Sequence, residues 1–143
     1  METFEYYISE FISNAKGVTY EGSSTYAEIR RSNDRFLREE ELSLTISESF
    51  SDRITDVASY LDDKDARVRR SIAYLLLGKM NPPDEIAKIA IRVLEDYANA
   101  ERGDETLMAR GFLLAYGSKH CTKTRASDDV SLMSTLKKKY ISD

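Results

Sequence analysis

Hydrophobic side chains recur at every third or fourth position along most of this chain, the spacing that places them on one face of an α-helix. The first such segment covers about residues 2–16 and ends at Gly17, because glycine favours the end of a helix. A second, highly charged helix is expected over about 25–40, begun by a capping box at Thr25 and Glu28. Its apolar side carries Tyr26, Ile29, Phe36 and Leu37.

Residues 41–50 fit two patterns. Leu42, Leu44 and Ile46 alternate with polar residues, which is the period of a β-strand. Leu42 and Ile46 also begin a series spaced four apart that continues through Phe50, which is the period of a helix. We expect a third helix here, which continues to Leu61, because the sequence offers no second convincing strand for pairing.

The second half of the chain carries clearer helical patterns. One helix is expected over about 66–79, with the Asp65 side chain as its N-cap. The next is expected over about 82–98, and Pro82 and Pro83 suit its first turn, where no backbone N–H is needed. The apolar stripe of the earlier helix consists of Val68, Ile72, Leu75 and Leu76.

A sixth helix is expected to begin at Asp104 and to end at Gly117, which leaves His120 and Cys121 in a loop. A seventh is expected over about 127–139, with acids at its start and three lysines at its end, as the helix dipole favours. The apolar stripe of the sixth helix is predicted to consist of Leu107, Gly111, Leu114 and Ala115.

Composition supports an all-α chain and argues against several classes of protein. The 143 residues suit a single domain spanning 1–143, and six glycines with two prolines leave few turns for a β-sandwich. The longest apolar run, 72–77, is far shorter than the roughly 20 residues of a membrane span. One cysteine and one histidine cannot build a disulfide within the chain or a structural zinc site. We therefore expect a cytoplasmic protein that is no enzyme, with no catalytic, cofactor-binding or metal-binding residues and no cofactor.

The chain also overlays on itself after a shift of 39 residues, for example Phe50 on Ile89 and Val68 on Leu107. Two helical hairpins of this length are typical of α-solenoids. Residues 61–78 resemble a HEAT repeat, whose pattern is matched by Asp65, Val68, Arg69, Ala73, Leu77 and Gly78. The second unit is degenerate, so the resemblance covers about 50–118. It implies a short right-handed α-α superhelix of about seven helices.

In a HEAT solenoid the second helix of each pair lines the concave surface, so the resemblance implies which side chains would meet a partner. Arginine and tyrosine are enriched among the residues that dominate binding energy. For Arg69, internal pairing with acids such as Asp62, Asp63 or Asp104 is an equal alternative. The predicted partner-binding residues are Arg67, Arg70, Tyr74, Arg110 and Tyr116.

These features favour a helical-repeat module that binds another protein, and its most concrete form is a small stoichiometric inhibitor of the immunity-protein type. The net charge of −4 suits capture of a basic partner such as a toxin. The alternative is a nucleic-acid-binding protein resembling the HEAT-like DNA alkylation-repair glycosylases. The segments 66–80 and 106–127 carry +4 each and favour that alternative, whereas the acidic pI near 5.2 opposes it. A third hypothesis is self-association through Leu77, Leu113 and Tyr116.

Overall fold

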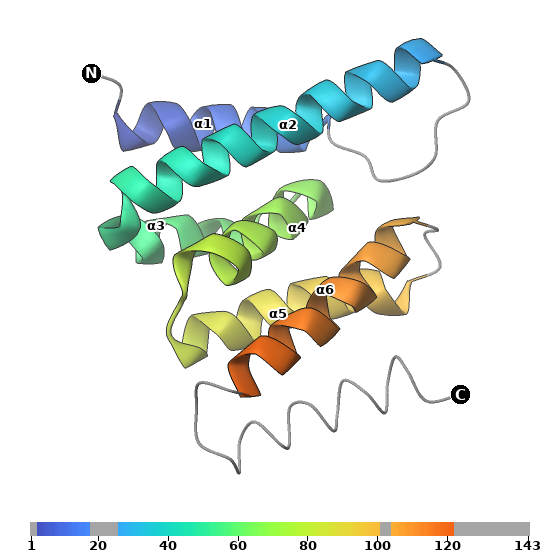
Figure 1. Ribbon diagram of the computed structural model, residues 1–143. Helices are drawn as coiled ribbons and strands as arrows, with labels where there is room; N and C mark the ends of the chain where they lie inside the picture. The colour runs from blue at the N-terminus through green and yellow to red at the C-terminus, as the bar shows by residue number, and fades with distance from the viewer. Residues whose placement is uncertain (1–2, 18–25, 101–103, 122–143) are drawn as a thin grey trace. The chain divides into compact units, whose positions relative to one another are not determined.

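The computed structural model describes residues 3–17, 26–100 and 104–121, and every regular element among them is a helix (Figure 1). The prediction of an all-α protein is therefore confirmed for this part of the chain. The capping box at Thr25 and the helix over 127–139 lie outside the described residues. In chain order the helices are α1 (Phe4–Ala15), α2 (Tyr26–Ser49), η1 (Ser51–Arg53), α3 (Ile54–Ala58), η2 (Ser59–Asp62), α4 (Ala66–Leu75), η3 (Leu76–Met80), α5 (Asp84–Asn99) and α6 (Asp104–Cys121).

Packing divides the chain into two compact units. Unit 1 extends from Met1 to Val93, and unit 2 extends from Leu94 to Asp143, so that the division falls within α5. Unit 1 contains α1 to α4 and the first part of α5. Unit 2 contains the end of α5 and α6.

In unit 1, α1 and α2 lie side by side (Figure 1). The Thr3 hydroxyl caps α1 by accepting a hydrogen bond from the Tyr6 N–H, at 3.2 Å. The apolar stripe of α1 is buried as its spacing predicts. Burial of such a stripe is the main source of stability for a short helix, because an isolated helix of this length is marginal in water. The buried members are Phe4, Ile8, Phe11 and Ala15.

Residues 41–49 are helical, which confirms the helical interpretation of the ambiguous stretch. The expected separate third helix to Leu61 is wrong, because residues 41–49 continue α2 and the chain beyond Phe50 forms η1, α3 and η2. Leu42 and Ile46 are buried, whereas Leu44 between them is 46% exposed. A strand would have placed all three on one face. Leu37 is 59% exposed, so its predicted place on the buried side of the helix is wrong.

The α4 segment follows its predicted pattern closely. The Asp65 carboxylate accepts from the Arg67 N–H at 2.8 Å and caps the helix. Val68, Ile72 and Leu75 are buried. A π-helical turn, η3, carries the helix to Met80, one residue past the predicted end, and Asn81 then takes a left-handed conformation with φ of 51°. Asparagine tolerates this conformation better than most residues, so it ends the helix here.

In unit 2, α6 buries a different face from the predicted one. Leu113 is fully buried, whereas Leu107 is 64% exposed and Gly111 and Ala115 also face solvent. The predicted stripe is thus largely the outer face. The helix also continues past Gly117 to Cys121, so the expectation of a loop at His120 and Cys121 is wrong. The apolar residues of α6 lie on all sides of the helix. Their spacing therefore predicts a helix but does not determine which side is buried.

The 39-residue register is also wrong. It pairs the buried Val68 with the exposed Leu107, and it pairs Phe50, whose ring packs 5.6 Å from that of Phe4, with the 49% exposed Ile89. A shift of 38 pairs buried residues with buried residues in α4 and α6. These pairs are Val68 with Thr106, Ser71 with Ala109, and Leu75 with Leu113.

Candidate functional site

The five predicted binding residues do not form one surface that the structure describes. Arg67, Arg70 and Tyr74 lie on α4 in unit 1, whereas Arg110 and Tyr116 lie on α6 in unit 2. Each group is therefore described within its own unit.

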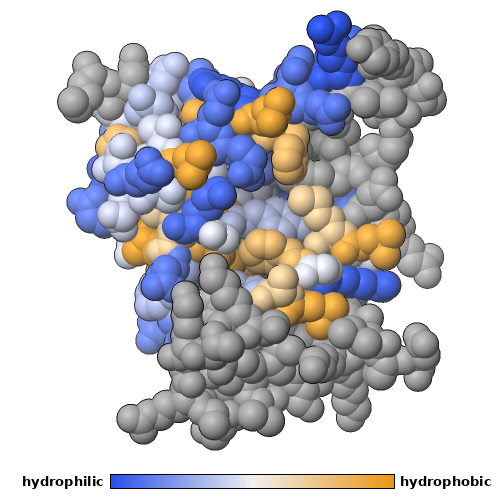
Figure 2. All heavy atoms as spheres, viewed as in Figure 1, coloured by the Kyte–Doolittle hydropathy of each residue, from blue (hydrophilic) through white to orange (hydrophobic). Residues whose placement is uncertain are grey.

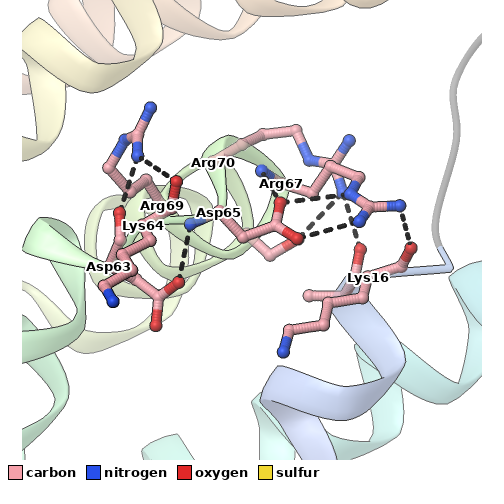
Figure 3. A network of polar contacts seen from close by, with 9 residues as sticks. Lys16, Asp63, Lys64, Asp65, Arg67, Arg69 and Arg70 are labelled. Atoms are coloured by element: carbon pink, nitrogen blue, oxygen red, sulfur yellow. Dashed lines mark hydrogen bonds and ion pairs between the residues drawn. The ribbon is translucent and has the colours of Figure 1, made fainter.

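Arg70 is an internal residue with only 1% of its surface exposed. Its Nη2 atom donates to the carbonyl oxygen of Ala15 at 3.1 Å, in the last turn of α1 (Figure 3). A buried charge is costly unless hydrogen bonds compensate it, and the carbonyls at the C-terminal end of a helix carry partial negative charge. The side chain thus joins α4 to α1, and the expectation that Arg70 faces a partner is corrected.

Arg67 is exposed and lies beside the same helix end (Figure 3). Its Nη2 atom forms an ion pair with Asp65 at 2.8 Å, and Nη1 donates to the Lys16 carbonyl oxygen. Hydrogen bonds from the Arg67 side chain and backbone lower the pKa of Asp65 to about 2. The positive charge of Arg67 therefore has a carboxylate and a helix end as its partners.

Arg69 also donates hydrogen bonds to backbone carbonyl oxygens. Its Nη1 atom donates to the carbonyl oxygens of Asp63 at 2.6 Å and Lys64 at 3.2 Å, in the turn that precedes α4 (Figure 3). Internal pairing, one of the two alternatives for this residue, is thus present, although the acceptors are backbone carbonyls. The three arginines of the basic segment 66–80 all act within unit 1.

In unit 2 the predicted residues also make internal contacts. The Nε atom of the half-buried Arg110 donates to the Ala98 carbonyl oxygen at 2.8 Å, near the end of α5. The Tyr116 ring stacks on Phe112, with 6.3 Å between ring centroids. Tyr74 in unit 1 is half-buried. A partner-binding role for Arg67, Tyr74, Arg110 and Tyr116 stays a prediction.

Self-association through the three residues named for it meets a similar difficulty. Leu77 is 5% and Leu113 0% exposed, and Tyr116 is half-buried and stacks on Phe112. Two of the three side chains are therefore not exposed for contact with a second copy.

The predicted binding set left out the exposed acidic residues, although the sequence left open whether an acidic surface binds. Carboxylates face solvent along the second half of α2 and through η1, α3 and η2. The sequence signal was the segment 41–65, which sums to −5. We call this set the acidic surface, and its exposed members are Glu40, Glu41, Glu48, Asp52, Asp56 and Asp62.

Three basic side chains at this surface are ion-paired to its acids. Arg38 pairs with Glu41 at 3.3 Å, and Lys79 pairs with Glu40 at 3.4 Å. Arg53 contacts Asp56 at 2.6 Å, and that hydrogen bond raises the pKa of the guanidinium. Acids still outnumber bases, so the acidic surface keeps a net negative charge.

Two exposed leucines lie on α2, the helix that also carries Glu40, Glu41 and Glu48. Leu37 and Leu44 are seven residues apart on α2, which places them on the same side of the helix, opposite the buried Ile46. Figure 2 shows small hydrophobic patches surrounded by hydrophilic residues over this helix. The surface is therefore acidic at its rim and apolar at points along the helix.

The described residues contain no group of three or more His, Cys, Asp or Glu side chains that could hold a metal ion. They also contain no helix long and apolar enough to cross a membrane. No protein family, curated protein or solved structure matches this chain, so its resemblance to HEAT repeats stays a prediction.

Proposed function

We propose that this protein binds another protein, that the contact surface of that partner is basic, and that the chain itself catalyses no reaction. The observation that carries the proposal is the acidic surface of unit 1, where exposed carboxylates outnumber the bases beside them. Complementary charge speeds encounter and excludes partners of the wrong sign.

The contacts of the arginines favour a protein over a nucleic acid as partner. Nucleic-acid affinity comes largely from arginines and lysines that neutralise phosphates. In unit 1 the guanidinium groups of Arg67, Arg69 and Arg70 instead hydrogen-bond to backbone carbonyls. A phosphate backbone would also be repelled by the acidic surface.

A stoichiometric inhibitor of a basic protein is the most concrete form of this proposal. Such an inhibitor needs a stable scaffold and a charged surface that captures its target quickly, and it needs no chemistry of its own. Its fold would serve to hold the carboxylates in place, which the buried stripes of α1, α2 and α4 achieve.

The test is capture followed by reconstitution. The immobilised chain would retain its partner from an extract of the source cells, and the retained protein would be purified separately. Calorimetry should then give a 1:1 complex whose affinity falls as salt is added, because exposed charges are screened. A double charge reversal, Glu48→Lys/Asp52→Lys, should weaken association roughly tenfold or more.

The matched control reverses an exposed acid in unit 2, Asp96→Lys, and should leave the affinity within about twofold, because the charge lies outside the acidic surface. Parallel titrations use double-stranded DNA and single-stranded RNA. Salt-sensitive binding to either nucleic acid, with no protein forming a 1:1 complex, would contradict the proposal.

A further inference from the structure

We infer that the outer face of α2 is the docking surface, and that it takes a lysine- or arginine-rich amphipathic helix of the partner protein. This inference rests on the proposed function and names its surface and the chemistry of the docking segment. The outer face is defined by Leu37, Glu40, Glu41, Leu44 and Glu48.

The geometry of the outer face is that of an apolar ridge. Leu37 and Leu44 are separated by seven residues, or about 10 Å along the helix axis at 1.5 Å per residue. They are 59% and 46% exposed, while Leu42 and Ile46 bury the inner side of the same helix. The inner side of α2 is therefore buried in the core of unit 1. The two leucines of the outer face are exposed and available for contact with another molecule.

Single exposed leucines are common on protein surfaces. Two of them, two turns apart on one helix face, match the spacing at which side chains of one helix pack against those of another. A partner helix could cover both leucines at once, because its own apolar side chains recur with the same period.

The charges around the two leucines determine the charge that a docking segment must carry. Glu41 lies midway between the two leucines, Glu48 lies one turn beyond Leu44, and Glu40 lies on the flank. The bases nearby, Arg38 and Lys79, pair with Glu41 and Glu40, so three carboxylates face two bases and the outer face keeps an excess of negative charge. A helix with aliphatic residues on one side and basic residues along its edges would pack against the two leucines and form ion pairs with the carboxylates.

A synthetic peptide of leucine and lysine, patterned so that its leucines share one helix face, is the probe. A peptide of the same composition, with its order shuffled so that the leucines do not share a face, is the control. Amide NMR spectra of the full chain should show the patterned peptide shifting resonances of 37–48 first. The shuffled peptide should bind at least about tenfold more weakly, since it cannot cover both leucines.

Variants of the chain sharpen the test. Leu37→Ala/Leu44→Ala should weaken peptide binding roughly tenfold, because truncated anchor residues dominate such losses. Glu41→Gln/Glu48→Gln should weaken it at low salt and reduce its salt dependence. The control Leu107→Ala removes a still more exposed leucine, in unit 2, and should leave binding unchanged.

The outcomes separate this inference from the proposed function. If the leucine pair is dispensable both for the peptide and for a reconstituted partner that binds 1:1, the inference is wrong and the proposed function stands. If no partner is reconstituted, the proposed function fails first. If the chain alone forms dimers that Leu37→Ala/Leu44→Ala dissociates, the occupant is a second copy, and the inference of a basic partner helix is overturned.

Discussion

The Nη2 atom of Arg70 lies 3.1 Å from the carbonyl oxygen of Ala15, a residue 55 positions earlier in the chain. The last carbonyls of a helix have no partner within the helix, and they carry the negative end of its dipole. A buried guanidinium is a suitable partner for them, since it presents several donors in a plane. Arg67 makes the equivalent contact with Lys16, so two residues of α4 hold the end of α1.

Removing the buried guanidinium should destabilise unit 1. Arg70→Met keeps much of the side-chain length but leaves the Ala15 carbonyl oxygen without this donor, so the free energy of unfolding should fall by about 2–4 kcal/mol. Urea denaturation measures the change. The exposed residue Arg31 provides the control Arg31→Met, expected within about 0.5 kcal/mol of the parent. An Arg70→Met variant as stable as that control would contradict the structural role of Arg70.

The Asp65–Arg67 pair predicts a pH dependence of stability. The pKa of Asp65 is lowered from 3.8 to about 2 in the folded chain. A carboxyl that binds its proton less tightly when folded contributes stability above the unfolded pKa, and this contribution is lost as pH falls from about 4 to 2. Asp65→Asn keeps an N-cap side chain but loses the ion pair, so it should cost up to about 1 kcal/mol near neutral pH.

Urea unfolding of the parent and of Asp65→Asn across that pH range checks this prediction. The difference in stability between them should shrink as pH falls toward 2. Asp62→Asn, in the preceding turn, controls for the loss of one exposed negative charge. A difference of the same size at both ends of the range would show that the ion pair does not stabilise the folded chain.

The orientation of α6 can be tested with two leucines of the same helix. Leu113 is fully buried and Leu107 is 64% exposed. Leu113→Ala should lower the free energy of unfolding by about 2–5 kcal/mol, because it opens a cavity in a packed core. Leu107→Ala should change it by less than about 0.5 kcal/mol. Guanidinium denaturation of both variants, compared with the parent, decides the orientation, and a costlier Leu107→Ala would reverse it.

Gly111 offers a stabilising substitution. A Cβ atom added at this exposed position within α6 would meet nothing within 4 Å. Gly111→Ala should therefore raise the free energy of unfolding by roughly 0.5–1 kcal/mol, because alanine loses less backbone entropy in a helix. The comparison is Gly17→Ala, whose Cβ would overlap the guanidinium of Arg35 and should bring no such gain. Thermal unfolding measures both, and a destabilised Gly111→Ala would contradict the open surface at this position.

Local patterns were sufficient to predict most helices and the N-cap of α4. The Asp65 cap depends on a residue two positions away, and the stripe of α4 depends on period alone, so both follow from neighbouring residues. The assignment of residues 41–49 to a helix could also be made from the sequence, because Leu42 and Ile46, which the structure buries, are spaced four residues apart. The exposure of Leu37 and Leu107 could not be predicted from local patterns.

The sequence by itself determined that this protein is helical and where several helices begin, because these properties are decided within a few residues. Only the tertiary structure decided the roles of the arginines and the buried side of α6. Arg70 and Arg67 find their acceptors more than 50 residues away, so no local pattern could distinguish a helix-capping arginine from a partner-binding one. In α6, apolar residues lie on all sides of the helix, and only tertiary packing selects Leu113 over Leu107 as the buried residue.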